Sequence, residues 1–416
     1  MAKITQIIIG DELLSGKIQD LNLKWLATAI LSTKHKLVAT RIIGDDEDQI
    51  KSVLTQSLDE SDVIIITGGL GPTKDDKTKK VLGDWIGGQQ KENQEAITLA
   101  KKHYARWNRE WTSELNSYHL IPEGITPLYN PVGFAPGLML KKNGTFIFAA
   151  PGVPREFQGM LNEVIIPIID KEIGGDEAEL ELFNIRTYGI PEEVIFGTLC
   201  PGLWEQLEDY GSVSSLPGIN GVDITLRLLK NDETQIKKNK VIELLKTTNL
   251  YPNIWHIGLE SLQEVVVLKA REKGITFSFA ESCTGGLVSS LITDISGSST
   301  PFIGSIVSYS NEVKINKLGV KSETLKKFGA VSKETALEMA IGAREKLNTD
   351  IAISLTGIAG PTGGTEDKPV GTVGIGFSTA SSSGSDIYHF HGDRVRLKER
   401  FAAKALSILL DLINKA

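Results

Sequence analysis

The sequence has little of several features that mark particular classes of protein. Only two cysteines, Cys200 and Cys283, occur among 416 residues. Their spacing supports neither a disulfide framework nor a thiolate metal site, so a reducing compartment fits. No long basic block offsets the net charge of −7, which argues against nucleic acid or an anionic membrane as the main partner. No apolar run is long enough to span a bilayer, and we expect no signal peptide before the first strand, so the default is a soluble cytoplasmic protein.

The chain is long enough for two or three domains, and its composition, with 41% hydrophobic and 23% charged residues, is that of an ordinary globular protein. Short apolar runs alternate with helical patterns in the first part, at residues 4–9, 21–31 and 63–67. The alternation resumes after about residue 259. This arrangement predicts mostly parallel sheets covered by helices on both faces.

An acidic, glycine-bearing stretch at residues 171–181 indicates a boundary, and a smaller α+β unit follows it. The small size of this unit suits a connector. We therefore expect a multidomain α/β protein, in which two doubly wound α/β domains at 1–172 and 257–416 are joined by a small α+β module at 173–256.

Two loops of the first domain combine glycines with acidic side chains, and each follows a predicted strand, where open α/β sheets bind ligands. Glycines let backbone amides approach a phosphate, and neighbouring carboxylates suit Mg²⁺. Helix capping and turn formation would explain either loop alone. Together the loops favour a phosphate-ligand site. The predicted ligand-binding residues are Gly10, Asp11, Glu12, Thr67, Gly68, Gly69, Gly71, Asn130 and Gly152, and the predicted metal ligands are Asp75 and Asp76.

Three segments of this domain, at residues 10–16, 67–76 and 151–157, resemble the N-terminal domain of CinA proteins, which is related to molybdopterin-binding proteins. The resemblance implies a nucleotide-type ligand and, in some members, ADP-ribose pyrophosphatase activity that depends on Mg²⁺ or a similar divalent cation. The chain departs from the family pattern at two places near the ligand loops. Tyr118-His119 stands where Gln-Ala is usual, and Phe134 stands where threonine is usual. A tyrosine and a phenylalanine there could fill a pocket.

The most informative segment is Ala-Glu-Ser-Cys-Thr-Gly-Gly at residues 280–286. Its Ser282 lies on a predicted strand-to-helix turn, where a hydroxyl is exposed and backbone amides can stabilise an oxyanion. A serine needs a base to become a good nucleophile. Histidine is the usual base, but His389 and His391 share one face of a strand and are interpreted as structural. Lys314, in the first turn of a predicted helix, could act instead if its pKa is lowered.

Simpler explanations stay open for each of these residues. Ser282 and Thr284 could be helix caps, and Lys314 could be a solvated surface lysine. Cys283 is either a rival nucleophile or a buried packing residue. Ser299 lies in what could be an ordinary loop, and the spacing does not decide which serine attacks.

A second glycine-rich loop at residues 357–364 follows a predicted strand and suits a phosphate or a ribose, although a plain mobile loop is the alternative. Arg394 then begins the last helix, where it could contact a phosphate bidentately or pair with Asp393. The predicted substrate-binding residues are Thr284, Gly285, Gly286, Gly357, Ala359, Gly360, Thr362, Gly363 and Arg394.

Segments at residues 280–286, 309–314, 356–364 and 392–394 closely resemble the CinA C-terminal domain. The resemblance implies deamidation of nicotinamide mononucleotide to nicotinate mononucleotide and ammonia, without a metal. It implies Ser282 as the nucleophile and Lys314 as its base, assisted by Ser299 and Tyr309. It also gives a KH-like middle module. That module has no convincing Gly-x-x-Gly clamp, so we expect a spacer that forms a homodimer rather than direct nucleic-acid binding.

Three functions follow from these interpretations. The main hypothesis is the amidohydrolase of the C-terminal domain, which acts on small-molecule nucleotides. The second is metal-dependent cleavage of ADP-ribose in the N-terminal domain. The third is a non-catalytic, nucleotide-sensing scaffold linked to DNA uptake, since the family name comes from competence.

Overall fold

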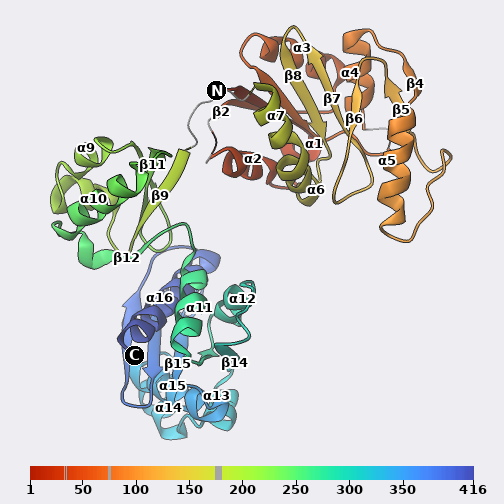
Figure 1. Ribbon diagram of the computed structural model, residues 1–416. Coiled ribbons are helices and arrows are strands. Elements are labelled where there is room, and N and C mark those ends of the chain that lie inside the picture. Colours follow the sequence, from red (N-terminus) through yellow and green to blue (C-terminus); the bar gives the residue numbers. More distant parts are fainter. Residues whose placement is uncertain (32, 34, 74–75, 174–179) are drawn as a thin grey trace. The chain divides into compact units, whose positions relative to one another are not determined.

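The computed structural model describes the chain from Met1 to Ala416 apart from residues 32, 34, 74–75 and 174–179 (Figure 1). The described residues form two compact units. One comprises Met1–Glu181 with Leu228–Thr234, and the other comprises Leu182–Arg227 with Gln235–Ala416. The predicted boundary at residue 172 lies beside a range outside the described residues, and the one at residue 256 lies within the last strand of the middle sheet, Ile254–Ile257.

The N-terminal unit is built on a six-stranded sheet with the order β2-β1-β3-β8-β7-β6. Its first four strands are parallel, and β7 and β6 are antiparallel additions, so the predicted mostly parallel sheet is mixed. The strands are β1 (Lys3–Ile9), β2 (Lys36–Ile43), β3 (Val63–Thr67), β6 (Thr126–Leu128), β7 (Gly137–Lys142) and β8 (Thr145–Ala150). A separate pair joins β4 (Gln90–Glu92) and β5 (Leu120–Pro122).

Helices cover both faces of this sheet, which is why β3 is buried along its whole length. Alternate side chains of β3 enter different cores: Ile64 and Ile66 pack with α3 and α4, whereas Val63 and Ile65 pack with α2, α6 and α7. A strand buried on both faces has a continuous apolar sequence. Its sequence therefore lacks the alternation of polar and apolar residues that would distinguish one face from the other. The helices are α1 (Asp11–Leu14), α2 (Asn22–Ile30), α3 (Glu47–Leu58), α4 (Thr78–Ile86), α5 (Gln94–Ala105), α6 (Pro154–Met160) and α7 (Ile166–Ile173).

The middle part of the chain forms a four-stranded sheet with the order β10-β11-β9-β12. Its elements are β9 (Leu180–Thr187), α8 (Glu192–Val194), α9 (Leu203–Glu208), β10 (Ser212–Pro217), β11 (Val222–Leu229), α10 (Thr234–Lys246) and β12 (Ile254–Ile257). Residues 217–221 connect β10 to β11, and the amide of Gly218 donates to the carbonyl of Gly221 at 2.7 Å. The segment that comes nearest to a Gly-x-x-Gly clamp is therefore the turn of a hairpin.

The C-terminal part contains a five-stranded sheet with the order β14-β13-β15-β16-β17. The first three strands are parallel, and β16 and β17 form an antiparallel hairpin around the serine-rich residues 379–382. The strands are β13 (Phe277–Glu281), β14 (Phe302–Val307), β15 (Ile351–Gly357), β16 (Thr372–Ser378) and β17 (Ser383–His389). This sheet is again mixed, so the doubly wound description holds for its parallel part.

Two groups of helices pack on this sheet. Side chains of α11 (Leu262–Lys273), α12 (Leu287–Thr293) and α16 (Arg394–Lys415) share a core with Phe277 and Phe279 of β13. Ala280 follows Phe279 in β13, so its side chain points to the other face of the sheet. There it packs with α13 (Asn311–Leu318) and α15 (Lys333–Leu347), and α14 (Ser322–Phe328) also contacts α15. Within the described ranges, no helix is long and apolar enough to cross a membrane.

Candidate active site

Ser282 and Lys314, which are 32 residues apart in the sequence, meet at the carboxyl end of β13. The Lys314 amine lies 2.9 Å from Ser282 Oγ and donates to the carbonyl oxygens of Ser308 at 2.8 Å and Tyr309 at 3.3 Å. Two carbonyls can only accept hydrogen bonds. If the amine is neutral, they can hold both of its hydrogens, and its lone pair then faces the serine hydroxyl. This is the geometry that a general base requires.

Burial favours the neutral form of this lysine. Lys314 is 1% exposed, and desolvation lowers the pKa of its ammonium group below the ordinary value, against a smaller opposing effect of Cys283. The α13 N-terminus is capped by Ser310, whose side chain accepts from the amide of Val313, and Lys314 lies in the first turn. The alternative of a solvated surface lysine is therefore wrong.

The turn that carries Ser282 is held by the carboxylate of Glu281. This side chain is fully buried and accepts from the amides of Gly286 at 3.0 Å, Val288 at 3.1 Å and Ser289 at 2.9 Å, and from the Ser289 hydroxyl at 2.6 Å. Glu281 thus occupies the start of α12, where a ligand anion would otherwise bind. Gly286 was predicted to bind substrate, but its amide is already bound to Glu281.

Other backbone amides of this turn also form hydrogen bonds within the protein. The amide of Ser282 donates to the carbonyl of Leu355 at 2.9 Å, and the amide of Gly285 donates to that of Ser282 at 3.2 Å. Gly285 and Gly286 have φ values of +64° and +100°, which other residues rarely adopt. Among the described residues, the buried hydroxyls of Thr284 and Ser308 have no hydrogen-bond partner. The sequence alone indicates a role for neither Glu281 nor Ser308, because neither residue type in isolation marks a site.

The thiol of Cys283 is a poor rival to Ser282. Burial raises its pKa to about 12, so it stays protonated near neutral pH, and a protonated thiol is a weak nucleophile. Of the two alternatives for Cys283, the structure favours the buried packing residue, because its side chain belongs to the core between the sheet and α16.

Arg394 joins two predicted parts of the site. Its guanidinium donates to the carbonyl of Gly360 at 2.6 Å and to the Tyr309 hydroxyl at 3.4 Å. Tyr309 is 63% exposed, and its backbone carbonyl accepts from Lys314. Asp393 accepts from the amide of Arg396 as the cap of α16. Arg394 therefore contacts the glycine loop, and it forms no ion pair with Asp393 among the described contacts.

The other residues of the 357–364 loop have mixed roles. A side chain on Gly357 would collide with the carbonyl of Thr372, so this glycine is needed by the β15–β16 pair. Ala359 is buried in the core. Thr362 and Gly363 are exposed, and Gly363 has a φ of +88°. The accessible part of the loop is thus 361–364, and Gly360 is buried.

Ser299 lies away from Ser282 within the chain. Ser299 is exposed and precedes β14, whereas Ser282 follows β13. Because β13 and β14 are parallel, with Phe277 opposite Phe302 and Glu281 opposite Val307, the two serines lie at opposite ends of the sheet. His389 lies 3.1 Å from the Thr372 hydroxyl, and His391 is exposed.

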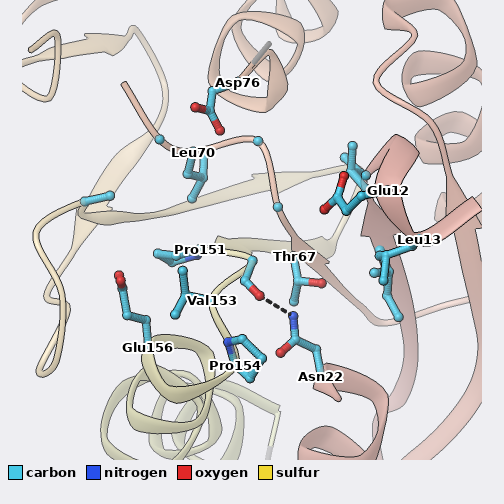
Figure 2. A pocket seen from close by; sticks show the side chains of 18 of the residues that line it. Glu12, Leu13, Asn22, Thr67, Leu70, Asp76, Pro151, Val153, Pro154 and Glu156 are labelled. Atoms are coloured by element: carbon cyan, nitrogen blue, oxygen red, sulfur yellow. Dashed lines mark hydrogen bonds between the residues drawn. The ribbon is translucent and has the colours of Figure 1, made fainter. Parts of the chain in front are cut away.

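In the N-terminal unit, the carboxyl ends of β1, β3 and β8 lead into a cavity of about 560 Å³. Figure 2 shows Glu12 and Asp76 across this cavity from Asn22 and Pro154. Of the predicted ligand residues, the cavity lining includes Gly10, Glu12, Thr67, Gly68, Gly69, Gly71, Asp76 and Gly152. The sequence thus located this pocket, although it named neither Asn22 nor Glu156, which also line it.

Asp11 and Asn130 serve the structure of the loops. Asp11 and Asp45 exchange hydrogen bonds between side chain and backbone at 3.2 and 3.3 Å. The fully buried Asn130 accepts from the amides of Val132 and Gly133 and donates to the Glu156 carboxylate at 2.8 Å. Burial raises the pKa of Glu156. These hydrogen bonds fix the loop beside the pocket.

Only one of the two predicted metal ligands lies within the described residues. Asp75 lies outside the described residues, and the carboxylate of Asp76 accepts from the amide and the hydroxyl of Thr73. Over the described ranges, no group of three or more histidine, cysteine, aspartate or glutamate side chains is placed to hold a metal.

Two family models match the chain. The probable molybdopterin binding domain matches residues 5–171, and the CinA C-terminal domain matches residues 259–413. A CinA-like protein of Chloroherpeton thalassium is 37% identical over 427 residues, covering 98% of each chain. One of Kosmotoga olearia is 35% identical, covering 97% of each. The chain belongs to the CinA family.

Solved structures of CinA relatives cover a part of the chain. The crystal structure of the competence/damage inducible protein CihA from Agrobacterium tumefaciens is 35% identical and covers 38% of this chain and 99% of its own, with a TM-score of 0.36. That of a competence or damage-inducible protein from Enterobacter asburiae is 31% identical and covers 37% and 99%, with a TM-score of 0.36. The CinA resemblance of both terminal domains is therefore confirmed by the family models and relatives.

Proposed function

We propose that the C-terminal domain hydrolyses the carboxamide of nicotinamide mononucleotide, giving nicotinate mononucleotide and ammonia. The observation that carries the proposal is the buried amine of Lys314 at 2.9 Å from Ser282 Oγ, with two carbonyl acceptors for its hydrogens. A hydroxyl paired with a base of lowered pKa is the arrangement that acyl transfer needs. The Ser282–Lys314 pair supports the reaction class, and the resemblance to the CinA C-terminal domain suggests the substrate.

The proposed reaction has two halves. Lys314 takes the proton of Ser282 as its Oγ attacks the amide carbon, and then gives that proton to the nitrogen. The C–N bond breaks, ammonia leaves, and the acid part stays as an ester on Ser282. Water, deprotonated by Lys314, then cleaves the ester and restores the serine. No metal ion or other cofactor is required in these steps.

The remaining groups bind the substrate and stabilise its charge. The buried hydroxyl of Thr284, which has no partner within the described part of the chain, is our candidate donor to the oxyanion of the tetrahedral intermediate. Arg394, held by Gly360 and Tyr309, is the candidate partner of the nucleotide phosphate. A homodimer is proposed as the working form.

The proposal is tested by ammonia release from nicotinamide mononucleotide with the purified full chain, Ser282→Ala and Lys314→Met. We expect activity in the parent chain and none above background in either variant. Full activity in both variants would overturn the assigned roles, and tight binding of the substrate without turnover by the parent chain would favour the scaffold hypothesis instead.

A second candidate function concerns the N-terminal cavity. Its charged lining is acidic, with Glu12, Asp20, Asp45, Asp76 and Glu156. A phosphate there would require a compensating cation, which favours the metal-dependent cleavage of ADP-ribose as the alternative activity. Cleavage that is lost on chelation and reduced in Asp76→Ala would support it, and cleavage that survives both would reject it.

A further inference from the structure

Ser308 carries a buried hydroxyl that the reaction proposed above does not use. The residue directly follows β14 and is fully buried, and among the described residues its hydroxyl has no hydrogen-bond partner. Because buried polar groups are nearly always paired, an unpaired one calls for an explanation. The carbonyl oxygen of the same residue accepts from the Lys314 amine at 2.8 Å. An unused hydroxyl therefore belongs to a residue that already contacts the proposed base.

The pairing of β13 with β14 puts this hydroxyl on the same face of the sheet as Ser282. The strands are parallel, and the amide of Ser308 donates to the carbonyl of Glu281 at 2.8 Å, so Ser308 lies beside Ser282. Two residues earlier in each strand, Ala280 and Ile306 pack in one core with α13. Side chains two residues apart along a strand share a face. Both serines thus continue the face that the helix of the base covers.

The lysine amine needs a further acceptor only after it has taken up a proton. A neutral amine has two hydrogens, which the carbonyls of Ser308 and Tyr309 can hold. The ammonium ion has three, and Ser282 Oγ becomes a poor acceptor for the third once it is bonded to the acyl carbon. Lys314 is 1% exposed, so water gives the ion little stabilisation. A second hydroxyl beside the amine would supply the missing acceptor.

We propose that Ser308 is a positioning residue for the amide hydrolysis: its hydroxyl accepts a hydrogen bond from the Lys314 ammonium ion while that ion holds the proton of Ser282. Rotation about the Cα–Cβ bond of Ser308 brings Oγ from its unpaired position to the ion, which its own carbonyl already contacts. A hydrogen bond to a charged group is stronger than one between neutral groups, so the bond forms in the charged state. The inference rests on the proposed function, because it concerns the base of that reaction.

Ser305 provides a matched control on the same strand. Its hydroxyl is also buried without a partner within the described part of the chain. It lies opposite Phe279, whose side chain packs in the core on the other face of the sheet from α13. Ser308→Ala and Ser305→Ala each remove one unpaired hydroxyl, so neither should lower Tm. A catalytic difference between the two variants would therefore come from the place of the hydroxyl and not from its loss as such.

The kinetic test follows ammonia release from nicotinamide mononucleotide against pH for the parent chain and both variants. A hydroxyl that accepts from the ammonium ion favours the charged form, so its loss should lower the pKa of Lys314 and move the acid limb of kcat/KM to lower pH by about one unit. We expect kcat to fall about tenfold in Ser308→Ala and to stay at the parent value in Ser305→Ala. Identical profiles for the two variants would overturn the proposal.

A second measurement does not depend on amidase activity. The full chain, labelled with ¹³C at the lysine Cε atoms, is titrated by NMR, and the Lys314 signal is the one missing from Lys314→Met. Its pKa should be about one unit lower in Ser308→Ala than in the parent chain, and unchanged in Ser305→Ala. An unchanged pKa in Ser308→Ala would overturn this inference even if the parent chain releases ammonia. A lowered pKa in a chain that releases none would support the hydrogen bond and overturn only the proposed function.

Discussion

The two candidate sites differ in how their buried polar groups are paired. In the C-terminal domain the Glu281 carboxylate and the Lys314 amine are both buried and both hold several protein partners. In the N-terminal cavity, the Asn22 oxygen and the Thr67 hydroxyl are buried without a partner among the described residues. Hydrogen bonds to other protein groups fix the geometry of a reacting side chain. A buried polar atom without a protein partner is instead free to hydrogen-bond to a ligand. The comparison therefore favours proton transfer at the Ser282–Lys314 pair and a bound ligand in the N-terminal cavity.

The largest expected effect is that of Lys314→Met on ammonia release. Loss of the base should lower kcat about 10³-fold. Tm should not fall, because a desolvated amine is replaced by an apolar side chain of similar length. Lys404→Met is the control: burial also lowers the pKa of Lys404, but its amine lies over the rings of Tyr188 and Tyr388. Equal loss of activity in Lys314→Met and Lys404→Met would show that the effect is not specific to the base beside Ser282.

Glu281→Gln should have the second-largest effect on kcat. A glutamine can accept with its oxygen, but its amino group would face backbone amides that also donate, so the turn that carries Ser282 should shift. We expect kcat to fall about 30-fold with little change in KM, because misplacement of a reacting group affects the chemical step. Steady-state kinetics measures kcat and KM, and thermal melting shows whether the variant is still stably folded. A change in KM alone would show that Glu281 does not position the serine.

The pH dependence of kcat/KM follows from the lowered pKa of Lys314. The base must be neutral, so kcat/KM should fall about tenfold per pH unit below that pKa and level off above it. The level region should begin well below pH 10, where an ordinary lysine would still be protonated. A rate that rises steadily to pH 10 would indicate a solvated lysine and would remove the difference between the two sites.

Arg394→Lys should have a smaller effect. A lysine offers one point charge in place of the planar fork, so it cannot keep both Gly360 and Tyr309 while it contacts a phosphate. KM for nicotinamide mononucleotide should rise about tenfold and kcat should change less than threefold. Nicotinamide riboside, which has no phosphate, serves as the control substrate, since its KM should be the same in both chains.

The smallest expected effect is that of Cys283→Ala. A thiol whose pKa is raised to about 12 is protonated at neutral pH and takes no part in the reaction. Ammonia release should stay within about twofold of the parent chain. Loss of activity without loss of stability would make the cysteine a reacting group.

The sequence predicted many of the site residues, but it did not predict which of them contact one another. The parallel strands, the two glycine-rich ligand loops and the segment around Ser282 could be predicted from apolar runs and turn chemistry. The distance between Ser282 and Lys314 could not, because it depends on the register of two strands. The roles of Glu281 and Asn22 were missed because each depends on whether a partner is present in three dimensions. The KH-like character of the middle module and the homodimer stay predictions.

The central claim is that Ser282 Oγ forms the covalent intermediate. It is tested most directly by acid-quenching the full chain during turnover of nicotinamide mononucleotide and locating the acyl group by peptide mass spectrometry. The account predicts an acyl ester on Ser282 in the parent chain and no adduct in Ser282→Ala. An acyl group on Ser299 or Cys283 in the parent chain, or turnover by Ser282→Ala, would contradict it.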